Sequence, residues 1–430
     1  METPPSLYSP RFVLLLGLQF ACGLGFSSFL LLPKYLTEVH GANADVIGLI
    51  VAAGPVAAVA AIPFLATRID RLPLRWLMAA GALAMFVTSL GFATLGPPSA
   101  AMVLLRALQG AGFVAFFGSA TVLATQLAPA PRLGQALGLL GAANLATNAI
   151  APALAEIIAS THDWRPVFLA SAACSLLAGL ASLVRIETPA APATPAGAAA
   201  TPSPTAIWQP RFLRLVYTGA MVGVAFGTVI TFYQPLALEL GIREVRDLFL
   251  GYTAGALVVR VALGGLLDRF DRRRLASMAC GAYALVVLAT SALRPGWLLP
   301  LGLGLGFAHG ALWPVLSALA VEGTDARVRG ALMTWFGGSF HLGVTLSTLG
   351  FGFLAHSVGY RAVLVIAAAG TASAAWVVSR LDAKSGLTER VAALRLALPR
   401  AELRPAPEPF PDRADGLARS ERTPTARRTT

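Results

Sequence analysis

Five ionisable side chains lie inside long apolar stretches of this sequence, where charge is costly. They are Arg106, Glu156, Arg260, His309 and His341. A charged group surrounded by lipid or by apolar side chains loses its hydration, so such groups are rare there and usually pair with one another, bind ions or move protons. These five residues are therefore the first candidates for chemistry.

Arg106 belongs to the segment Arg106-Ala-Leu-Gln109-Gly110, which is predicted to be helical. Residues three and four positions apart lie on one face of a helix, so Gln109 and Gly110 lie beside the arginine. The glycine allows a close helix approach, which lets the guanidinium turn inward. The alternative is that Arg106 extends towards the membrane surface, about 10 Å away along the helix. We favour the inward orientation because an arginine that faces lipid is costly.

Arg260 shares a helix face with Gly264 and Asp268, which follow it at four and eight positions. The arginine lies roughly 12 Å from Asp268 along the helix axis. Its planar, fork-shaped guanidinium suits carboxylates, so it either holds a carboxylate of a substrate or braces the end of the helix. The sequence leaves both roles open.

The two histidines and the glutamate also have alternative roles. His309 and His341 each fall near the middle of an apolar stretch, and histidine is the side chain that most easily changes protonation near neutral pH. For either histidine alone, a neutral ring hydrogen-bonded between helices is the simpler expectation. Glu156 is the only acid well within a span of the first half, and its position near the end of that span fits a solvated or a buried role.

Sequence motifs of enzymes and of ATP-driven pumps are missing. The chain has no G-x-x-x-x-G-K-[ST] for nucleotide binding, no H-E-x-x-H and no G-x-S-x-G. We therefore expect a protein that is not an enzyme, with no catalytic residues, no metal site and no cofactor.

Membrane-spanning helices are the elements that must position these side chains. Of the 430 residues, 56% are hydrophobic and 13% are charged, whereas about a quarter of the residues in a soluble domain are charged. A span needs about 20 apolar residues. The sequence predicts an all-α membrane protein with twelve spans at 12–32, 46–66, 74–94, 100–126, 134–158, 165–184, 212–232, 248–267, 275–293, 297–320, 330–355 and 361–378.

The distribution of basic residues between the loops predicts the orientation. One set of alternating loops carries most of the arginines, and such loops lie on the cytoplasmic side of a membrane. Both termini fall on that side. The net charge of +12 thus indicates membrane orientation rather than nucleic-acid binding. The opposite loops carry only Lys34, Arg165, Arg243, Arg246, Arg294 and Arg361.

A charged turn occurs twice and indicates an internal repeat. The segment Gly264-Gly-Leu-Leu-Asp268-Arg269-Phe-Asp271-Arg272-Arg273 follows the eighth span, and Asp70-Arg71 occurs 198 residues before Asp268-Arg269, after the second span. Pro10-Arg11-Phe12 also recurs 200 residues later, and Pro33 and Pro235 mark matching predicted helix ends. Two copies of a six-helix unit explain these matches.

The repeated turn, of the form G-x-x-x-D-R-x-x-R-R in its second copy, resembles the signature loop of the major facilitator superfamily, and R-x-x-Q-G at Arg106 resembles the motif of that family's fourth helix. The resemblance covers nearly all of residues 11–380. It implies two pseudo-symmetric bundles of six helices, and it implies that the residue matching Arg106 in proton-driven exporters takes part in proton coupling. The residues assigned to a cytoplasmic gate are Asp70, Arg71, Gly264, Asp268, Arg269, Arg272 and Arg273.

The expected organisation follows from the repeat and from the composition. Residues 1–186 form the first bundle, 187–208 a Pro/Ala-rich cytoplasmic linker, 209–381 the second bundle and 382–430 a disordered basic tail. Arg106, Gln109, Glu156, Arg260, His309 and His341 are the candidates for proton coupling or for lining the cavity.

The predicted function is proton-coupled efflux of a small drug-like molecule or secreted metabolite, in the manner of the arabinose-efflux-permease-like and drug:proton antiporter branch that the chain resembles. One alternative is a proton symporter that imports a small organic anion, and another is a membrane sensor or scaffold that transports nothing. The expected partners are a small-molecule substrate, protons and the lipid bilayer, without nucleic acid. The chain is expected to act as a monomer in the inner, plasma membrane.

Overall fold

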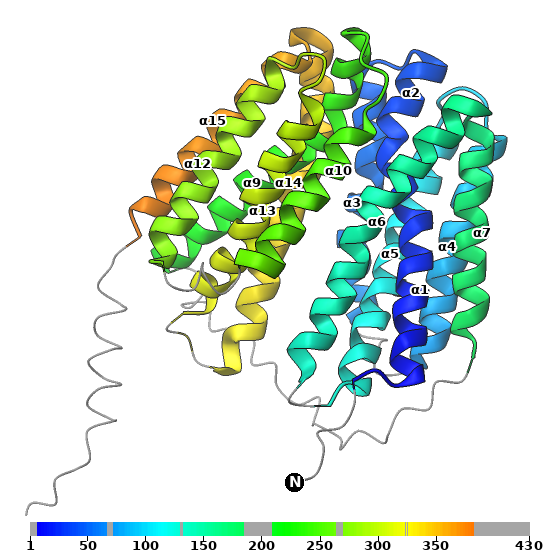
Figure 1. The fold of residues 1–430 in the computed structure, drawn as a ribbon, viewed down its shortest axis with the longest axis horizontal. Coiled ribbons are helices and arrows are strands. Elements are labelled where there is room, and N and C mark those ends of the chain that lie inside the picture. Colours follow the sequence, from blue (N-terminus) through cyan, green and yellow to red (C-terminus); the bar gives the residue numbers. More distant parts are fainter. Residues whose placement is uncertain are drawn as a thin grey trace, which may run out of the picture. The chain divides into compact units, whose positions relative to one another are not determined.

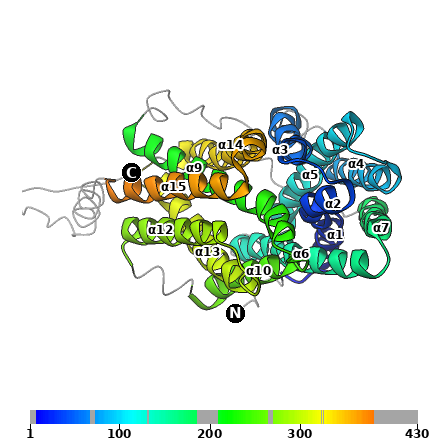
Figure 2. The ribbon, with the colours of Figure 1, turned by 90° about the horizontal axis from the view of Figure 1, so that it is seen from above.

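The computed structural model describes residues 7–66, 72–129, 132–184, 209–263, 270–322, 324 and 326–381. Within these residues every regular element is helical. Figure 1 shows two groups of helices, α1–α7 in blue to green and α9–α15 in green to orange, and the view from above in Figure 2 separates the same two groups. The fold is thus the pair of helical bundles expected from the internal repeat.

The first bundle begins with a long segment that contains a short 3₁₀ turn. Its elements are α1 (Pro10–Ser27), the 3₁₀ segment η1 (Ser28–Leu31), α2 (Leu32–His40), α3 (Ala44–Ala66), α4 (Leu74–Thr94), α5 (Ala100–Leu127), α6 (Leu133–Thr161) and α7 (Trp164–Ser182). The second bundle consists of α9 (Pro210–Glu239), α10 (Arg246–Val258), the π-helical segment η3 (Val259–Leu263), α12 (Arg272–Ser291), α13 (Leu298–Val321), α14 (Ala326–Val358) and α15 (Tyr360–Ser379).

The described residues contain 11 segments that are long and apolar enough to cross a membrane, with α1, η1 and α2 counted as one. They correspond to eleven of the twelve predicted spans. The remaining prediction, residues 248–267, coincides with α10 and η3 as far as Leu263, and its last four residues lie outside the described part of the chain.

The first and seventh spans end later than the sequence analysis predicts. The chain stays helical after Pro33 as α2, and α9 continues through Pro235 to Glu239. A proline lacks its own N–H and crowds the preceding turn, but it does not force a helix to end. The 3₁₀ turn η1 comes just before Pro33, and beside Pro235 the Gln234 amide donates to the carbonyl of Ile230 at 2.9 Å. Both ends therefore extend beyond the predicted stops.

The eighth span changes from an α-helix to a π-helix at Val259. A π-helical turn inserts one extra residue into the helix and is frequently found at functional sites. Arg260 lies on this turn.

Glycines bring the helices of each bundle into backbone contact. A Cβ atom added to Gly306 on α13 would lie 2.1 Å from the Tyr252 carbonyl oxygen on α10, and one added to Gly223 on α9 would lie 2.1 Å from the Phe340 carbonyl oxygen on α14. In the first bundle Gly110 approaches Gly54 of α3 in the same way. Small residues at such crossings allow the tight packing that holds helices together in a membrane.

The two bundles meet mainly along four pairs of helices, α3 with α14, α6 with α10, α2 with α9, and α3 with α9. In the first pair, Gly48 faces the backbone of Thr348 and Gly352. We call the end at which α1 and α9 begin the linker end. The opposite end contains α2 and the turn after α9, and we call it the latch end because polar side chains join the two bundles there.

The contact between α10 and α13 gives the first prediction. Gly306→Ala places a methyl group against the α10 backbone, so we expect a loss of about 1–3 kcal/mol of unfolding free energy, the usual cost of overpacking. Thermal melting in detergent measures it. The control is Gly281→Ala on α12, because an added Cβ there meets no atom within 4 Å. Equal melting temperatures for the two variants would contradict the packing argument.

Candidate functional site

Glu156 on α6 forms the most highly connected polar contact between the two bundles. Its carboxylate accepts hydrogen bonds from Lys34 Nζ at 2.5 Å, Val245 N at 2.9 Å, Arg246 N at 3.1 Å and Arg246 Nη1 at 3.2 Å. The side chain is only 2% exposed. Because α10 begins at Arg246, the carboxylate from the first bundle caps the N-terminus of a helix in the second, where the helix dipole favours an anion.

Lys34 on α2 adds further bonds to this contact. Its Nζ donates to the Arg243 carbonyl oxygen at 2.5 Å, and its backbone N–H donates to Gln234 Oε1 at 3.1 Å. The Gln234 amide nitrogen donates in turn to the Leu30 carbonyl oxygen at 2.8 Å. We define the latch as the side chains of Lys34, Glu156, Gln234 and Arg246 together with the backbone of residues 243–246.

The latch joins residues that belong to different bundles. Lys34 and Glu156 come from the first bundle, whereas Gln234, Arg243, Val245 and Arg246 come from the second. If the bundles separate at this end, Glu156 keeps Lys34 and loses its other three hydrogen bonds. Since buried charges need such donors to offset their lost hydration, separation requires that water replace them. The buried role for Glu156 that the sequence left open is the one found in the structure.

Arg106 on α5 lies inside the first bundle and is 7% exposed. Its Nη1 donates to Gln109 Oε1, its guanidinium carbon lies 5.7 Å from the centre of the Phe29 ring, and a Cβ added to Gly54 would lie 3.0 Å from its Nη2. No carboxylate of the described residues lies within ion-pair distance of it. The side chain thus takes the inward orientation, held by an amide and an aromatic face.

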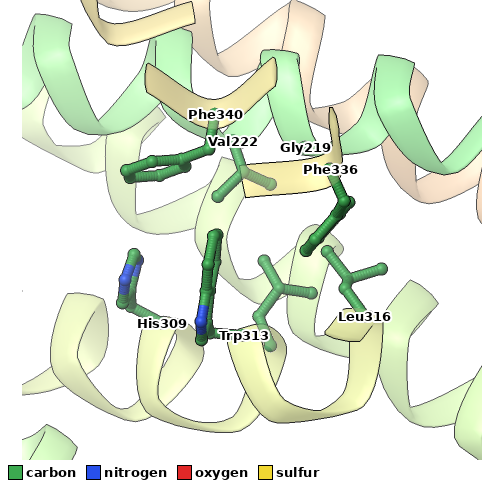
Figure 3. A pocket seen from close by; sticks show the side chains of 8 residues that line it. Gly219, Val222, His309, Trp313, Leu316, Phe336 and Phe340 are labelled. Atoms are coloured by element: carbon green, nitrogen blue, oxygen red, sulfur yellow. The ribbon is translucent and has the colours of Figure 1, made fainter. Parts of the chain in front are cut away.

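An aromatic crevice lies between α13 on one side and α9 and α14 on the other in the second bundle. Figure 3 shows Phe336, Phe340 and Val222 facing His309, Trp313 and Leu316 across it. The Trp313 ring centre lies 5.2 Å from that of Phe340 and 5.3 Å from that of Phe336. The facing side chains leave no space large enough for a water molecule between them, and the buried His309 Nδ1 has no hydrogen-bond partner.

Arg260 and His309 are brought close together, whereas His341 lies on another helix face. Arg260 follows Val259 on η3, and a Cβ added to Gly310, the residue after His309 on α13, would lie 3.2 Å from the Val259 Cβ. Arg260 is exposed, and its Nη1 would lie 3.8 Å from a Cβ added to Gly141 on α6 of the first bundle. His341 is exposed on α14, and its ring lies 5.6 Å from that of Phe340.

Only part of the predicted cytoplasmic gate lies in the described residues. Arg272 contacts Glu322 at 3.4 Å, and Arg273 donates to the carbonyl oxygen of Leu381. Glu322 also pairs with Arg211 at 2.7 Å. Outside the described residues are Asp70, Arg71, Gly264, Asp268 and Arg269.

Sequence reasoning missed Lys34 and Arg246 as site residues. It assigned both to loops at one end of the bundle, where they served only as markers of orientation. A signal for them exists in the sequence, because Glu156 is the one acid deep within a span of the first half and these two cations fall at the same end. Separations of 122 and 90 residues hide the pairing from any local pattern.

The sequence profile described as Major Facilitator Superfamily matches residues 14–304 and 216–407 of this chain. These two overlapping matches include both bundles. The chain therefore belongs to the major facilitator superfamily, a family of membrane transporters of small molecules.

Two curated relatives and one solved structure are similar to the chain. The chloramphenicol resistance protein of Streptomyces lividans is 33% identical over 229 residues, which is 50% of this chain and 55% of that protein. Multidrug resistance protein MdtG of Enterobacter lignolyticus (strain SCF1) is 26% identical over 277 residues, 62% of this chain and 66% of that protein. The chain thus spans between about half and two thirds of these relatives' length.

The solved structure is the crystal structure of the nucleoside transporter NupG. It superimposes with a TM-score of 0.69 at 15% sequence identity and covers 87% of this chain and 99% of NupG. At that identity the similarity establishes the fold alone.

The latch gives the second prediction. Glu156→Gln removes the charge that offsets Lys34, which is 5% exposed. Since a buried charge without its partner typically costs about 3–5 kcal/mol, thermal melting in detergent should show a large loss of stability. The matched control is Glu322→Gln, because the Arg211–Glu322 pair has side chains that are 28% and 31% exposed and such pairs contribute about 1 kcal/mol or less.

A double variant, Lys34→Met with Glu156→Leu, removes both charges and should recover much of that loss. If Glu156→Gln melts like Glu322→Gln, the latch does not hold the bundles together.

Proposed function

We propose that this chain is a proton-coupled exporter of small drug-like molecules that works by alternating access of its two bundles. The observation that carries the proposal is that the bundles are tied at one end. Polar contacts between the bundles include the latch, the His356–Asp45 pair at 3.6 Å at the same end, and one deeper bond from Thr253 Oγ1 to the Leu145 carbonyl oxygen at 3.3 Å. In a transporter built of two similar halves, an end that is tied by breakable polar contacts is a gate.

The linker end is proposed to face the cytoplasm. Arginines gather there in the described turns and helix ends, and positively charged loops stay on the cytoplasmic side. They include Arg211, Arg214, Arg272, Arg273 and Arg274. On this orientation the latch closes the outer side of an inner-membrane transporter, and parting the latch releases the substrate outwards.

Arg106 is proposed to support proton coupling without carrying the proton. A guanidinium does not lose its proton in proteins, so its charge is fixed through the cycle. Glu156 is the one buried carboxylate of the described residues. When the latch parts, this carboxylate loses three donors and meets the outer solution, where a proton can neutralise it. His309 and His341 are the other candidates for carrying a proton between the two sides.

The names of two similar proteins support the choice of substrate class and direction. One is called a chloramphenicol resistance protein and the other a multidrug resistance protein. Export of small organic molecules fits both names. Import of a small organic anion and a role without transport are outcomes that the vesicle experiment below can reveal.

Energy coupling gives the third prediction. Inside-out membrane vesicles that contain the protein are energised so that their interior becomes acidic. Uptake is then measured for two labelled compounds, chloramphenicol and the small organic anion 2-naphthoate. We expect accumulation inside the vesicles that collapses when a protonophore is added, because the sequence carries no nucleotide-binding motif. Accumulation that survives the protonophore and needs ATP would contradict proton coupling. Net loss from preloaded vesicles would favour import, and no flux of either compound would favour a sensor.

Arg106 gives the fourth prediction. Arg106→Ala removes the fixed buried charge and should abolish uptake driven by the proton gradient, while expression stays near that of the parent. Arg106→Lys should restore only part of the activity, because lysine lacks the planar fork that the Gln109 amide and the Phe29 ring contact. Arg165→Gln, which removes an exposed arginine at the start of α7, is the control and should transport normally. Full transport by Arg106→Ala would leave the arginine a purely structural residue.

A further inference from the structure

The charges that face the middle of the second bundle and its boundary with the first are positive. Arg260 lies at this boundary, and Arg106 is buried in the first bundle, each without a carboxylate partner among the described residues. The described acids lie elsewhere. Apart from Glu156 in the latch, they lie at helix ends or in turns: Glu38, Asp45, Asp163, Glu239, Glu244, Asp247, Asp271 and Glu322.

An aromatic wall surrounds His309 on α13, the helix that packs against the π-helical turn of Arg260. The His309 ring lies 5.3 Å from that of Phe226, 5.8 Å from that of Tyr252 and 5.9 Å from that of Phe340. Trp313 continues this wall one turn further along α13 (Figure 3). Flat rings of this kind bind other flat rings by offset or edge-to-face contact. The unpartnered Nδ1 of His309 adds one polar atom to an otherwise apolar surface.

We propose that the preferred substrates are aromatic anions, with the ring held against the wall of Phe226, His309, Trp313 and Phe340 and the carboxylate paired with Arg260. The guanidinium offers two parallel N–H groups to a carboxylate, which fixes its orientation as well as its position. This inference names the substrate of the proposed exporter and rests on that function, but it does not depend on what energises transport.

The same charges disfavour a cationic substrate. In a site of low dielectric constant, an ammonium group near a guanidinium is repelled much more strongly than in water. A site for cationic drugs would need a carboxylate to offset the charge, and the described residues place none beside Arg260 or Arg106. A neutral aromatic molecule gains the ring contacts but leaves Arg260 unpaired.

The test compares three ligands of one shape that differ in charge. The purified full-length protein in detergent is dialysed to equilibrium against labelled 2-naphthoate, 2-naphthamide or 2-naphthylmethylammonium at neutral pH. We expect 2-naphthoate to bind about tenfold or more tightly than the ammonium compound, with the amide between them. Arg260→Gln should weaken the binding of 2-naphthoate about tenfold and change that of the amide less than twofold. Trp313→Ala should weaken all three.

Two control variants separate local charge from net charge and from folding. Arg260→Lys keeps a positive charge without the fork and should bind 2-naphthoate with intermediate affinity. Arg165→Gln removes the same charge at the start of α7 and should leave all three affinities unchanged. Melting temperatures like that of the parent show that each variant is folded.

Three results would overturn the proposal. They are binding of the ammonium compound as tight as that of 2-naphthoate, an equal effect of Arg260→Gln on the carboxylate and the amide, and no saturable binding of 2-naphthoate. The dialysis uses no proton gradient, so failure of the protonophore experiment would remove proton coupling and leave the substrate class standing. Loss of 2-naphthoate binding with intact chloramphenicol export would remove the substrate class and leave the proposed exporter function standing.

Discussion

The carboxylate of Glu156 is the interaction on which the arrangement of the two bundles depends. It belongs to the first bundle, and three of its four hydrogen bonds come from residues of the second. A buried carboxylate needs such donors, so it cannot leave them without gaining water or a proton. The contact of α3 with α14 brings two small residues, Gly48 and Gly352, together. The latch therefore makes separation of the bundles at this end a discrete event.

Inside each bundle, close backbone contacts hold the helices together, in contrast to the polar contacts between the bundles. Backbone contact at Gly223, Gly306 and Gly110 leaves no space into which neighbouring helices can move without clashes. Each bundle is thus expected to move as a body, and the polar contacts between the bundles break and form around it. Since Arg246 both starts α10 and pairs with Glu156, breaking the latch also removes a cap from a helix that lines the bundle boundary. On the proposed mechanism, the same helix, α10, leads into the turn that carries Arg260 and so connects the latch to that residue.

Sequence patterns predict the helices well, because apolar length alone decides them. The span 74–94 was predicted with both of its observed ends. The Arg106–Gln109 contact was also within reach, because it depends only on a spacing of three residues in a helix. The π-helical turn at Arg260 was not, since nothing in the local composition marks it. The latch and the crevice were not predicted for another reason. Each needs side chains from three or more helices, and a single sequence does not say which helix faces meet.

Binding of the proposed substrate is expected to favour the state in which the latch is open. Without an anion, Arg260 faces the first bundle at Gly141 with its charge unpaired, and arginines gather at the linker end. These like charges oppose closure of the bundles at that end. A carboxylate bound at Arg260 reduces the repulsion, so the ligand binds best to the state in which the linker end is closed. A ligand shifts an equilibrium only by its difference in affinity between two states, and couplings of about 1–3 kcal/mol are typical. On the proposed mechanism, the latch must hold the bundles only slightly more strongly than this, so that substrate binding together with proton uptake can release it.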